Sequence, residues 1–176
     1  PLNDDLLLDN LQDVIIGITG LVGGLVRPAY QKNPPARPDI DVNWCGFSVL
    51  NQIPEAGNAY ISQNDNDADQ QRHETFELRC SFYGPNCKGY AQRLRDGLEV
   101  NQNREAMYLQ GMAYVGCDAI VPTQELASSQ WYDRADITLT IRRQLNRNYA
   151  ILPLLEAVGT IVTEDTTTEW ATGPEV

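Results

Sequence analysis

Two segments of this 176-residue chain alternate strictly between apolar and polar residues. In residues 73–83 the apolar positions are Phe76, Leu78, Cys80 and Phe82. In residues 135–141 they are Ala135, Ile137, Leu139 and Ile141. Successive side chains of a β-strand point to opposite faces of its sheet, so this period of two predicts two strands that each bury one face. The chain is therefore expected to cover one face of a sheet.

A helix is expected to supply part of that cover. Residues 4–25 carry leucine, valine and isoleucine at helical spacing, and their early aspartates suit the positive end of a helix. Gly17, Gly20, Gly23 and Gly24 weaken the second half, since each costs about 1 kcal/mol relative to alanine. Small residues also let a helix approach a neighbour closely.

A second helix is expected directly after the first strand. Gly84-Pro85 ends the strand, and Asn86 is expected to cap a helix that runs to about residue 100. The residues predicted to form its packed face are Cys87, Ala91, Leu94 and Leu98.

The remaining segments are shorter. Residues 28–40 contain four prolines and predict an extended connection, and the polar residues 64–71 predict a hairpin tip or a flexible loop. A short helix is expected at 103–111, and a short helix leading into a last strand within 152–162. Short strands are expected at 42–50, 60–61, 112–115 and 118–121.

These elements predict an α+β fold with a mixed, mainly antiparallel sheet packed against a long N-terminal helix and a second helix. One domain is expected over residues 1–165, because a single domain usually contains about 100–200 residues. Residues 166–176 form an acidic, threonine-rich tail that is expected to be mobile or docked on a neighbour.

Charge limits the partners. The net charge is −11, and both ends of the chain are acidic: residues 1–26 and 148–176 contain no lysine or arginine. Nucleic-acid binders normally show a basic face, so DNA and anionic membranes are poor partners for this chain. The apolar run 14–26 is shorter than the roughly 20 residues of a membrane-spanning helix, and no positive charge precedes it, so no export signal is visible.

Patterns for catalysis or metal binding are weak. His73 is the single histidine, so a two-histidine metal site is impossible. Asp65, Asp67 and Asp69 begin like a calcium loop, but Gln70 and Phe76 stand where that loop needs glycine and glutamate. The four cysteines form no C-x-x-C pair and predict reduced thiols and synthesis in the cytoplasm, with Cys80 and Cys87 in the core. No catalytic, cofactor-binding or metal-binding residue is expected, and the chain is not expected to be an enzyme.

Contacts with other protein subunits are the favoured role. Tryptophan, tyrosine and arginine dominate protein interfaces. Trp131, Tyr132 and Arg134 lie just before the second alternating segment, where Trp131 and Tyr132 suit an interface and the core equally well. Three arginines are expected near a turn after the segment, and the polar tail contains a tryptophan. The predicted interface residues are Trp131, Tyr132, Arg134, Arg142, Arg143, Arg147 and Trp170.

Taken in order, several segments resemble the neck or tail terminator proteins of tailed bacteriophages. The resemblance covers about residues 40–165 and is carried by the sequence FYGPN at 82–86, by RE at 104–105 with GMA at 111–113 and DAI at 118–120, by WYDRADITLTI at 131–141 and by AVGTI at 157–161. No single one of these motifs is diagnostic. The N-terminal helix and the threonine-rich tail fit the family less closely.

The resemblance implies a virion structural protein at the neck. Members form a ring, commonly a hexamer, that terminates the tail tube and joins it to the head connector. Partners would be identical copies, tail tube proteins, sheath proteins if the tail contracts, and connector proteins. DNA would pass through the ring without specific binding, along a channel hypothesised to be acidic.

Two other classes stay open at this point. The first is an acidic soluble binding protein, such as a DNA-mimic inhibitor, although the acids gather at the termini and in the 64–69 loop and not in one row. The second is an enzyme that holds a metal with Asp65, Asp67, Asp69 and Glu74.

Overall fold

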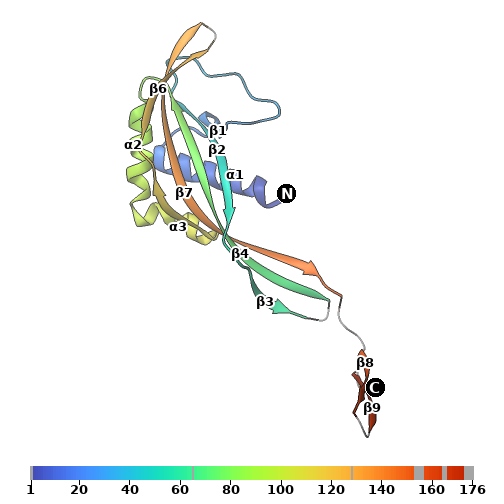
Figure 1. Cartoon of the computed structure of the whole chain (residues 1–176). Helices are drawn as coiled ribbons and strands as arrows, with labels where there is room; N and C mark the ends of the chain where they lie inside the picture. The colour runs from blue at the N-terminus through green and yellow to red at the C-terminus, as the bar shows by residue number, and fades with distance from the viewer. Residues whose placement is uncertain (1, 65, 128, 153–156, 164–165, 173–176) are drawn as a thin grey trace. The chain divides into compact units, whose positions relative to one another are not determined.

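The computed structural model describes residues 2–64, 66–127, 129–152, 157–163 and 166–172. Within these residues the elements, in chain order, are α1 (Leu2–Thr19), the 3₁₀ helix η1 (Gly23–Leu25), β1 (Val26–Pro28), β2 (Trp44–Pro54), β3 (Ala59–Gln63), β4 (Asp67–Tyr83), α2 (Cys87–Leu98), α3 (Asn101–Leu109), β5 (Met112–Cys117), β6 (Val121–Ala127), β7 (Gln130–Ala150), β8 (Ala157–Val162) and β9 (Thr167–Thr172). Figure 1 shows the elements with these labels.

The chain divides into two compact units. The first contains Pro1–Gly57 and Arg72–Leu145, and the second contains Asn58–Gln71 and Asn146–Val176. Strands β4 and β7 contribute residues to both. The expectation of one domain to residue 165 stays a prediction.

The main sheet has the order β1-β2-β4-β7-β5, with β3 also pairing with β4 and β6 with β7. Strand β1 runs parallel to β2, whereas β4 is antiparallel to β2 and β3, and β7 is antiparallel to β5 and β6. The predicted α+β class with a mixed, mainly antiparallel sheet is confirmed.

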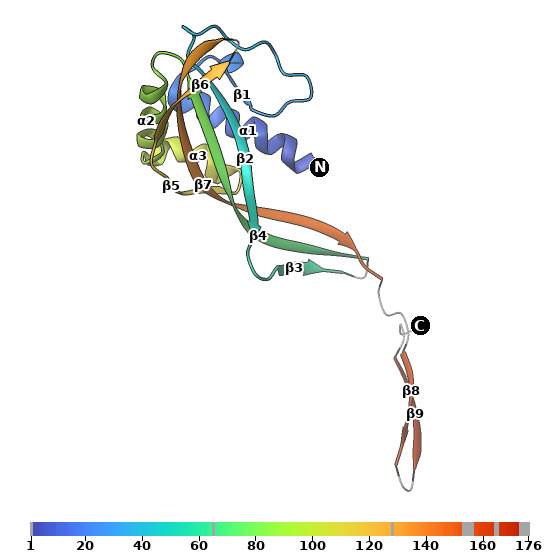
Figure 2. The ribbon, with the colours of Figure 1, turned by 45° about the horizontal axis from the view of Figure 1, so that its top comes forward.

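One face of this sheet in the first unit is covered by the helices (Figures 1 and 2). The apolar residues of both alternating segments are buried there, as predicted, together with the predicted packed face of α2. Helix α1 contributes Leu7, Leu11, Ile15 and Ile18 to the same core. Cys80 and Cys87 are buried and all four cysteines are free thiols.

The N-terminal helix is shorter than predicted. It ends at Thr19, because Gly20 adopts a left-handed conformation (φ +74°) and donates its N–H to the Ile16 carbonyl oxygen at 2.8 Å. Glycine adopts this conformation without a Cβ penalty and commonly ends helices. Asn86 precedes α2 but makes no side-chain capping bond, so its predicted capping role is wrong.

Both long strands also extend beyond the predicted segments. Residues 67–71 belong to β4, and of the described residues predicted as a hairpin tip or loop only Asn64 and Asn66 lie outside the strands. The turn expected at Arg142, Arg143 and Arg147 is wrong, since β7 continues through all three. The strand predicted at 118–121 begins at Val121, and the helix predicted near residue 152 falls largely outside the described residues.

The second unit contains a two-stranded sheet. Strands β8 and β9 pair in antiparallel fashion from Ala157↔Thr172 to Val162↔Thr167. The strand expected at 159–162 is part of β8. No sequence pattern predicted β9, which occupies part of the expected tail. Whether that tail docks on a neighbour stays a prediction.

Candidate functional site

In the first unit the helices cover one face of the sheet, and the opposite face is polar. Residues that alternate with the core positions point to it, and cross-strand neighbours there include Trp44↔Tyr83, Gly46↔Ser81 and Ser48↔Arg79. Antiparallel sheets commonly bury one face and leave the other to solvent. We call this surface the open face.

The loop at residues 29–43 contributes to the open face. We call this loop the strap. Arg27, on β1, donates from Nη1 to the Ala36 carbonyl oxygen at 3.1 Å. The prolines of the strap lack an N–H and restrict its backbone, which favours the extended course that the sequence predicted. The strap thereby carries Arg37 to the sheet.

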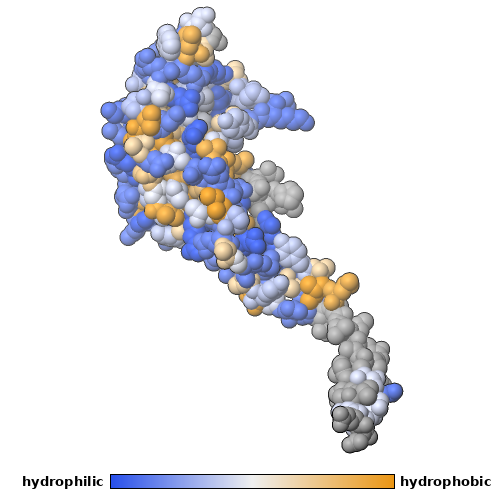
Figure 3. All heavy atoms as spheres, viewed as in Figure 1, coloured by the Kyte–Doolittle hydropathy of each residue, from blue (hydrophilic) through white to orange (hydrophobic). Residues whose placement is uncertain are grey.

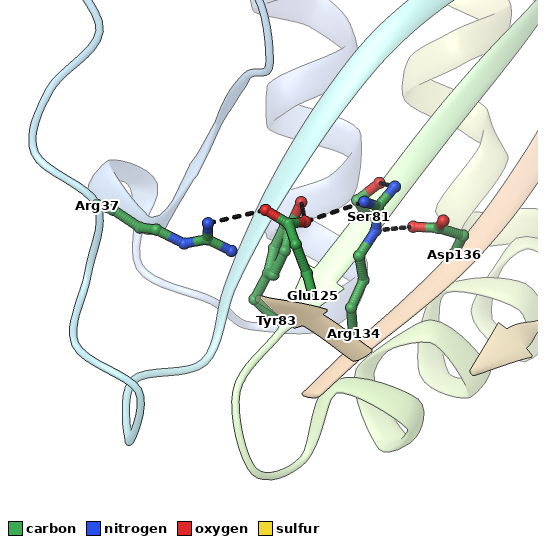
Figure 4. A network of polar contacts seen from close by, with 6 residues as sticks. All are labelled: Arg37, Ser81, Tyr83, Glu125, Arg134 and Asp136. Carbon is green, nitrogen blue, oxygen red and sulfur yellow. Dashed lines mark hydrogen bonds and ion pairs between the residues drawn. The ribbon is translucent and has the colours of Figure 1, made fainter. Parts of the chain in front are cut away.

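Glu125 on β6 is the centre of a polar network at this place (Figure 4). Its Oε1 accepts from Arg37 Nη1 at 2.8 Å, and its Oε2 accepts from Arg134 Nη1 at 3.0 Å and from the Tyr83 hydroxyl at 3.1 Å. Arg134 also donates to Asp136 at 2.7 Å and to Ser81 at 3.2 Å. The network joins the strap to β4, β6 and β7.

Aromatic rings and guanidinium groups stack in the same area. The rings of Trp44 and Tyr83 lie nearly parallel with centroids 4.2 Å apart. Arg27 lies 4.8 Å from the Trp44 centroid, and Arg37 lies 4.1 Å from the Tyr132 centroid and 4.9 Å from that of Tyr83. Cations over aromatic faces are attracted by the ring quadrupole, so these contacts hold the strap in place.

A groove of about 480 Å³ opens beside this network. It is lined by the strap, β1, β2, β4, Glu125 and Arg134, and its charged side chains are Arg27, Arg37, Arg79, Arg134 and Glu125. Four cations against one anion make the groove basic in a chain whose net charge is −11. We call it the arginine groove.

Hydrogen-bond donors are in excess there. Arg37 Nε, Arg37 Nη2 and Trp44 Nε1 are buried and have no acceptor among the described atoms. Arg79 is exposed and forms no ion pair with any described residue. Buried donors without acceptors are unfavourable, so the arginine groove suits a ligand that supplies oxygen acceptors.

Tyr83 and Glu125 keep fixed protonation states near neutral pH. Burial raises the pKa of Tyr83 to about 12, with the neighbouring Glu125 adding to the rise. Burial alone would raise the pKa of Glu125, but hydrogen bonds from Arg37, Tyr83 and Arg134 and the charge of Arg37 outweigh it and hold that pKa below its ordinary value. Groups of fixed charge suit recognition better than proton transfer, which needs a pKa near the working pH.

The structure brings together two of the seven predicted interface residues. Tyr132 and Arg134 both join the network, whereas Trp131 points to the opposite side and is 60% exposed. Arg142 pairs with Glu55 through two hydrogen bonds.

The other three predicted interface residues lie elsewhere. Arg143 is buried against Glu74 at the end of the core. Arg147 is exposed on the part of β7 in the second unit, and Trp170 lies on β9 opposite Gly159. An interface role for these seven residues stays a prediction.

Sequence reasoning missed Arg37, Trp44, Tyr83 and Glu125 as members of a site. Arg37 and Glu125 are separated by 88 residues, and no local pattern relates them. The available signal was the spacing of Arg79, Ser81 and Tyr83 on the polar side of the first alternating segment.

The carboxylates of the possible metal site have other partners in the structure. Asp69 accepts hydrogen bonds from Ser62 and Asn148, Asp67 accepts one from Asn64, and Glu74 pairs with Arg143. Asp65 lies outside the described residues. In the described part of the chain, no three histidine, cysteine, aspartate or glutamate side chains form a metal-binding group. Among the described helices, none has the length and apolar character to cross a membrane.

The structure defines an α+β protein whose sheet has one helix-covered face and one polar face that carries the arginine groove. A model of the phage neck terminator protein family matches residues 5–170, nearly the whole chain, and the chain belongs to that family. The resemblance found in the sequence is thereby confirmed. No curated protein matches the chain. The family consists of structural proteins of the phage neck. Membership therefore locates the protein in the bacteriophage neck, among tail and head components.

Proposed function

We propose that copies of this chain form a ring at the phage neck that terminates the tail tube and joins it to the head connector. Family membership over residues 5–170 is the observation that carries the proposal. The family resemblance implies a hexamer, and in any closed cyclic ring every copy has the same two neighbours.

Exposed apolar side chains support contacts with other subunits. Figure 3 shows apolar residues scattered among hydrophilic ones on the face viewed there. The large exposed side chains include Trp131 in the first unit and Tyr60 and Ile61 in the second, with 60%, 68% and 55% of their surfaces exposed. Burying such side chains in an interface contributes roughly 25 cal/mol per Å².

The interface residues proposed are therefore the accessible ones among those the sequence suggested. Trp131, Arg142 and Arg147 are exposed, and Arg134 is half-buried on the open face. Tyr132 is buried beneath Arg37 and is proposed to support the network from within its own chain. Arg143 is buried against Glu74 in its own chain and is proposed as a stabilising residue of the fold.

The net charge supports passage of DNA through the ring. Each copy carries −11, so a ring repels the phosphate backbone overall. We propose that acidic residues line the channel and that DNA passes without specific binding. Neutral or basic residues along the channel of an assembled ring would contradict this part.

The test is the mass of the purified chain alone and after mixing with isolated tail tubes. Native mass spectrometry should give a discrete ring, and electron microscopy should show that ring on one end of each tube. A chain that stays monomeric both alone and beside tubes would contradict the proposed function.

A further inference from the structure

We propose that the arginine groove of one copy binds residues 163–172 of a second copy. This inference rests on the proposed ring and specifies one contact that closes it. The groove belongs to the first unit of the receiving copy, and the bound segment contains β9 of the donating copy.

Charge complementarity is the first argument. Residues 163–172 contain Glu164, Asp165 and Glu169 and no lysine or arginine. The arginine groove presents four guanidinium groups, of which Arg37 and Arg134 share the carboxylate of Glu125. Arginine binds carboxylates through paired hydrogen bonds, so acidic side chains are the ligands that best match this lining.

The groove favours a peptide over a nucleic acid. Single-stranded nucleic acids bind by stacking bases on free aromatic faces. Here the Trp44 and Tyr83 rings stack on each other, and Arg27 and Arg37 lie over the same rings. The net charge of −11 also repels phosphate.

The donating segment has a reason to dock. Strands β8 and β9 form a sheet of two strands that pairs with no other described strand. An isolated two-stranded hairpin is at best marginally stable in water, so a surface that binds it contributes to its stability. The segment also contains a tryptophan, Trp170, a residue type enriched at interface hot spots.

Ring geometry favours a second copy as the donor. A cyclic ring is built from head-to-tail contacts, in which each copy presents two different patches that complement each other. A basic groove and an acidic segment on the same chain satisfy this requirement, because every copy can bind one neighbour and be bound by the other.

The first experiment measures binding of a labelled peptide with the sequence of residues 163–172 to the full chain by fluorescence anisotropy. A peptide with glutamine and asparagine in place of its three acids should bind roughly tenfold more weakly. The acidic peptide should bind more weakly by a similar factor when about 0.5 M salt is added, because salt screens the charges. Arg79→Glu should weaken binding by a similar factor, since Arg79 is exposed and forms no described ion pair.

Lys88→Glu is the matched control, because it makes the same charge change at an exposed position of α2, on the helix side of the sheet. It should bind the peptide like the unchanged protein. Equal binding by the Arg79→Glu and Lys88→Glu chains, or equal binding of the acidic and neutral peptides, would overturn the proposal.

The second experiment is a charge swap in the ring itself. Arg79→Glu alone and Glu164→Lys with Asp165→Lys should each reduce assembly by light scattering, and all three changes in one chain should restore it. The control is Glu105→Lys with Asp118→Lys, at exposed positions of α3 and of the loop between β5 and β6.

The outcomes distinguish failure of the groove contact from failure of the proposed ring function. Rings that form equally in all variants would overturn the groove contact and leave the proposed function standing. A wild-type chain that forms no ring, alone or with tail tubes, would overturn both the proposed function and the second copy as donor.

Discussion

On β4 and β7, neighbouring residues belong to two different surfaces. Phe82 is buried beneath the helices, whereas Ser81 and Tyr83 face the polar network. Ala135 and Ile137 are likewise in the core. Arg134, before them, and Asp136, between them, form an ion pair with each other on the open face. The covered face holds the fold together through apolar burial, and the open face holds directed charges that can select a partner.

The sharpest test of this comparison is a pair of adjacent substitutions. Phe82→Ala removes a ring that is 1% exposed and should lower the free energy of unfolding by about 3–5 kcal/mol. Ser81→Ala removes one hydroxyl acceptor of Arg134 and should cost about 1 kcal/mol. Urea denaturation of both variants measures the difference, and equal losses would refute the division between the faces.

The ion pair of Arg143 and Glu74 lies at the end of the covered face and tests how much burial adds to the strength of an ion pair. Both residues are buried, at 6% and 8% exposure, and the Arg143 guanidinium lies 5.8 Å from the Phe76 ring centroid. Glu74→Gln leaves the cation buried without its carboxylate, which should destabilise the protein by about 3 kcal/mol. Glu55→Gln is the control, because its pair with Arg142 is exposed and should contribute far less. Similar losses in the two variants would contradict this reading of burial.

Glu125 gives the open face its own pH dependence. Its folded-state pKa is depressed, so the stability that it contributes is present above its unfolded pKa, about 4.3, and is lost as the pH falls through the folded value. Glu125→Gln should therefore lower stability by about 1 kcal/mol at pH 7, and the difference from wild type should shrink below about pH 4. Thermal unfolding across pH 3–7 measures it. Glu105→Gln, at an exposed position of α3, should leave the profile unchanged.

The covered face could be predicted from sequence because its signal is local. A period of two in residues 76–82 and 135–141 determines which side chains are buried once the segments are strands, and the packed face of α2 follows from helical spacing. The extension of β7 beyond Ile141 could not be predicted in the same way. Arg142, Arg143 and Arg147 look like turn residues until Glu55 and Glu74, far away in sequence, are known to pair with two of them.

The open face could be predicted only in part. The residue types of Tyr132 and Arg134 predict interface positions, and both residues contact the network. Glu125 stands in a segment without apolar periodicity, and Arg37 in a proline-rich loop, so neither carried a signal. Contacts over such sequence separations depend on the register of β6 with β7 and on the course of the strap, which are tertiary properties.

Substitution of Trp131 should have the smallest effect on the stability of the folded chain. It therefore distinguishes a role in folding from a role in assembly. It is 60% exposed and lies next to Tyr132, which is 6% exposed beneath Arg37. Trp131→Ala should change the free energy of unfolding by less than about 0.5 kcal/mol, because substitutions at exposed positions rarely do more. If Trp131 contacts a neighbouring copy, the same variant should still weaken the ring by at least about tenfold in dissociation constant, the size expected when an aromatic anchor is removed from an interface. Urea denaturation and sedimentation velocity measure the two effects separately. Unchanged assembly would show that this tryptophan lies outside the contact, and a large loss of stability would show that it belongs to the fold.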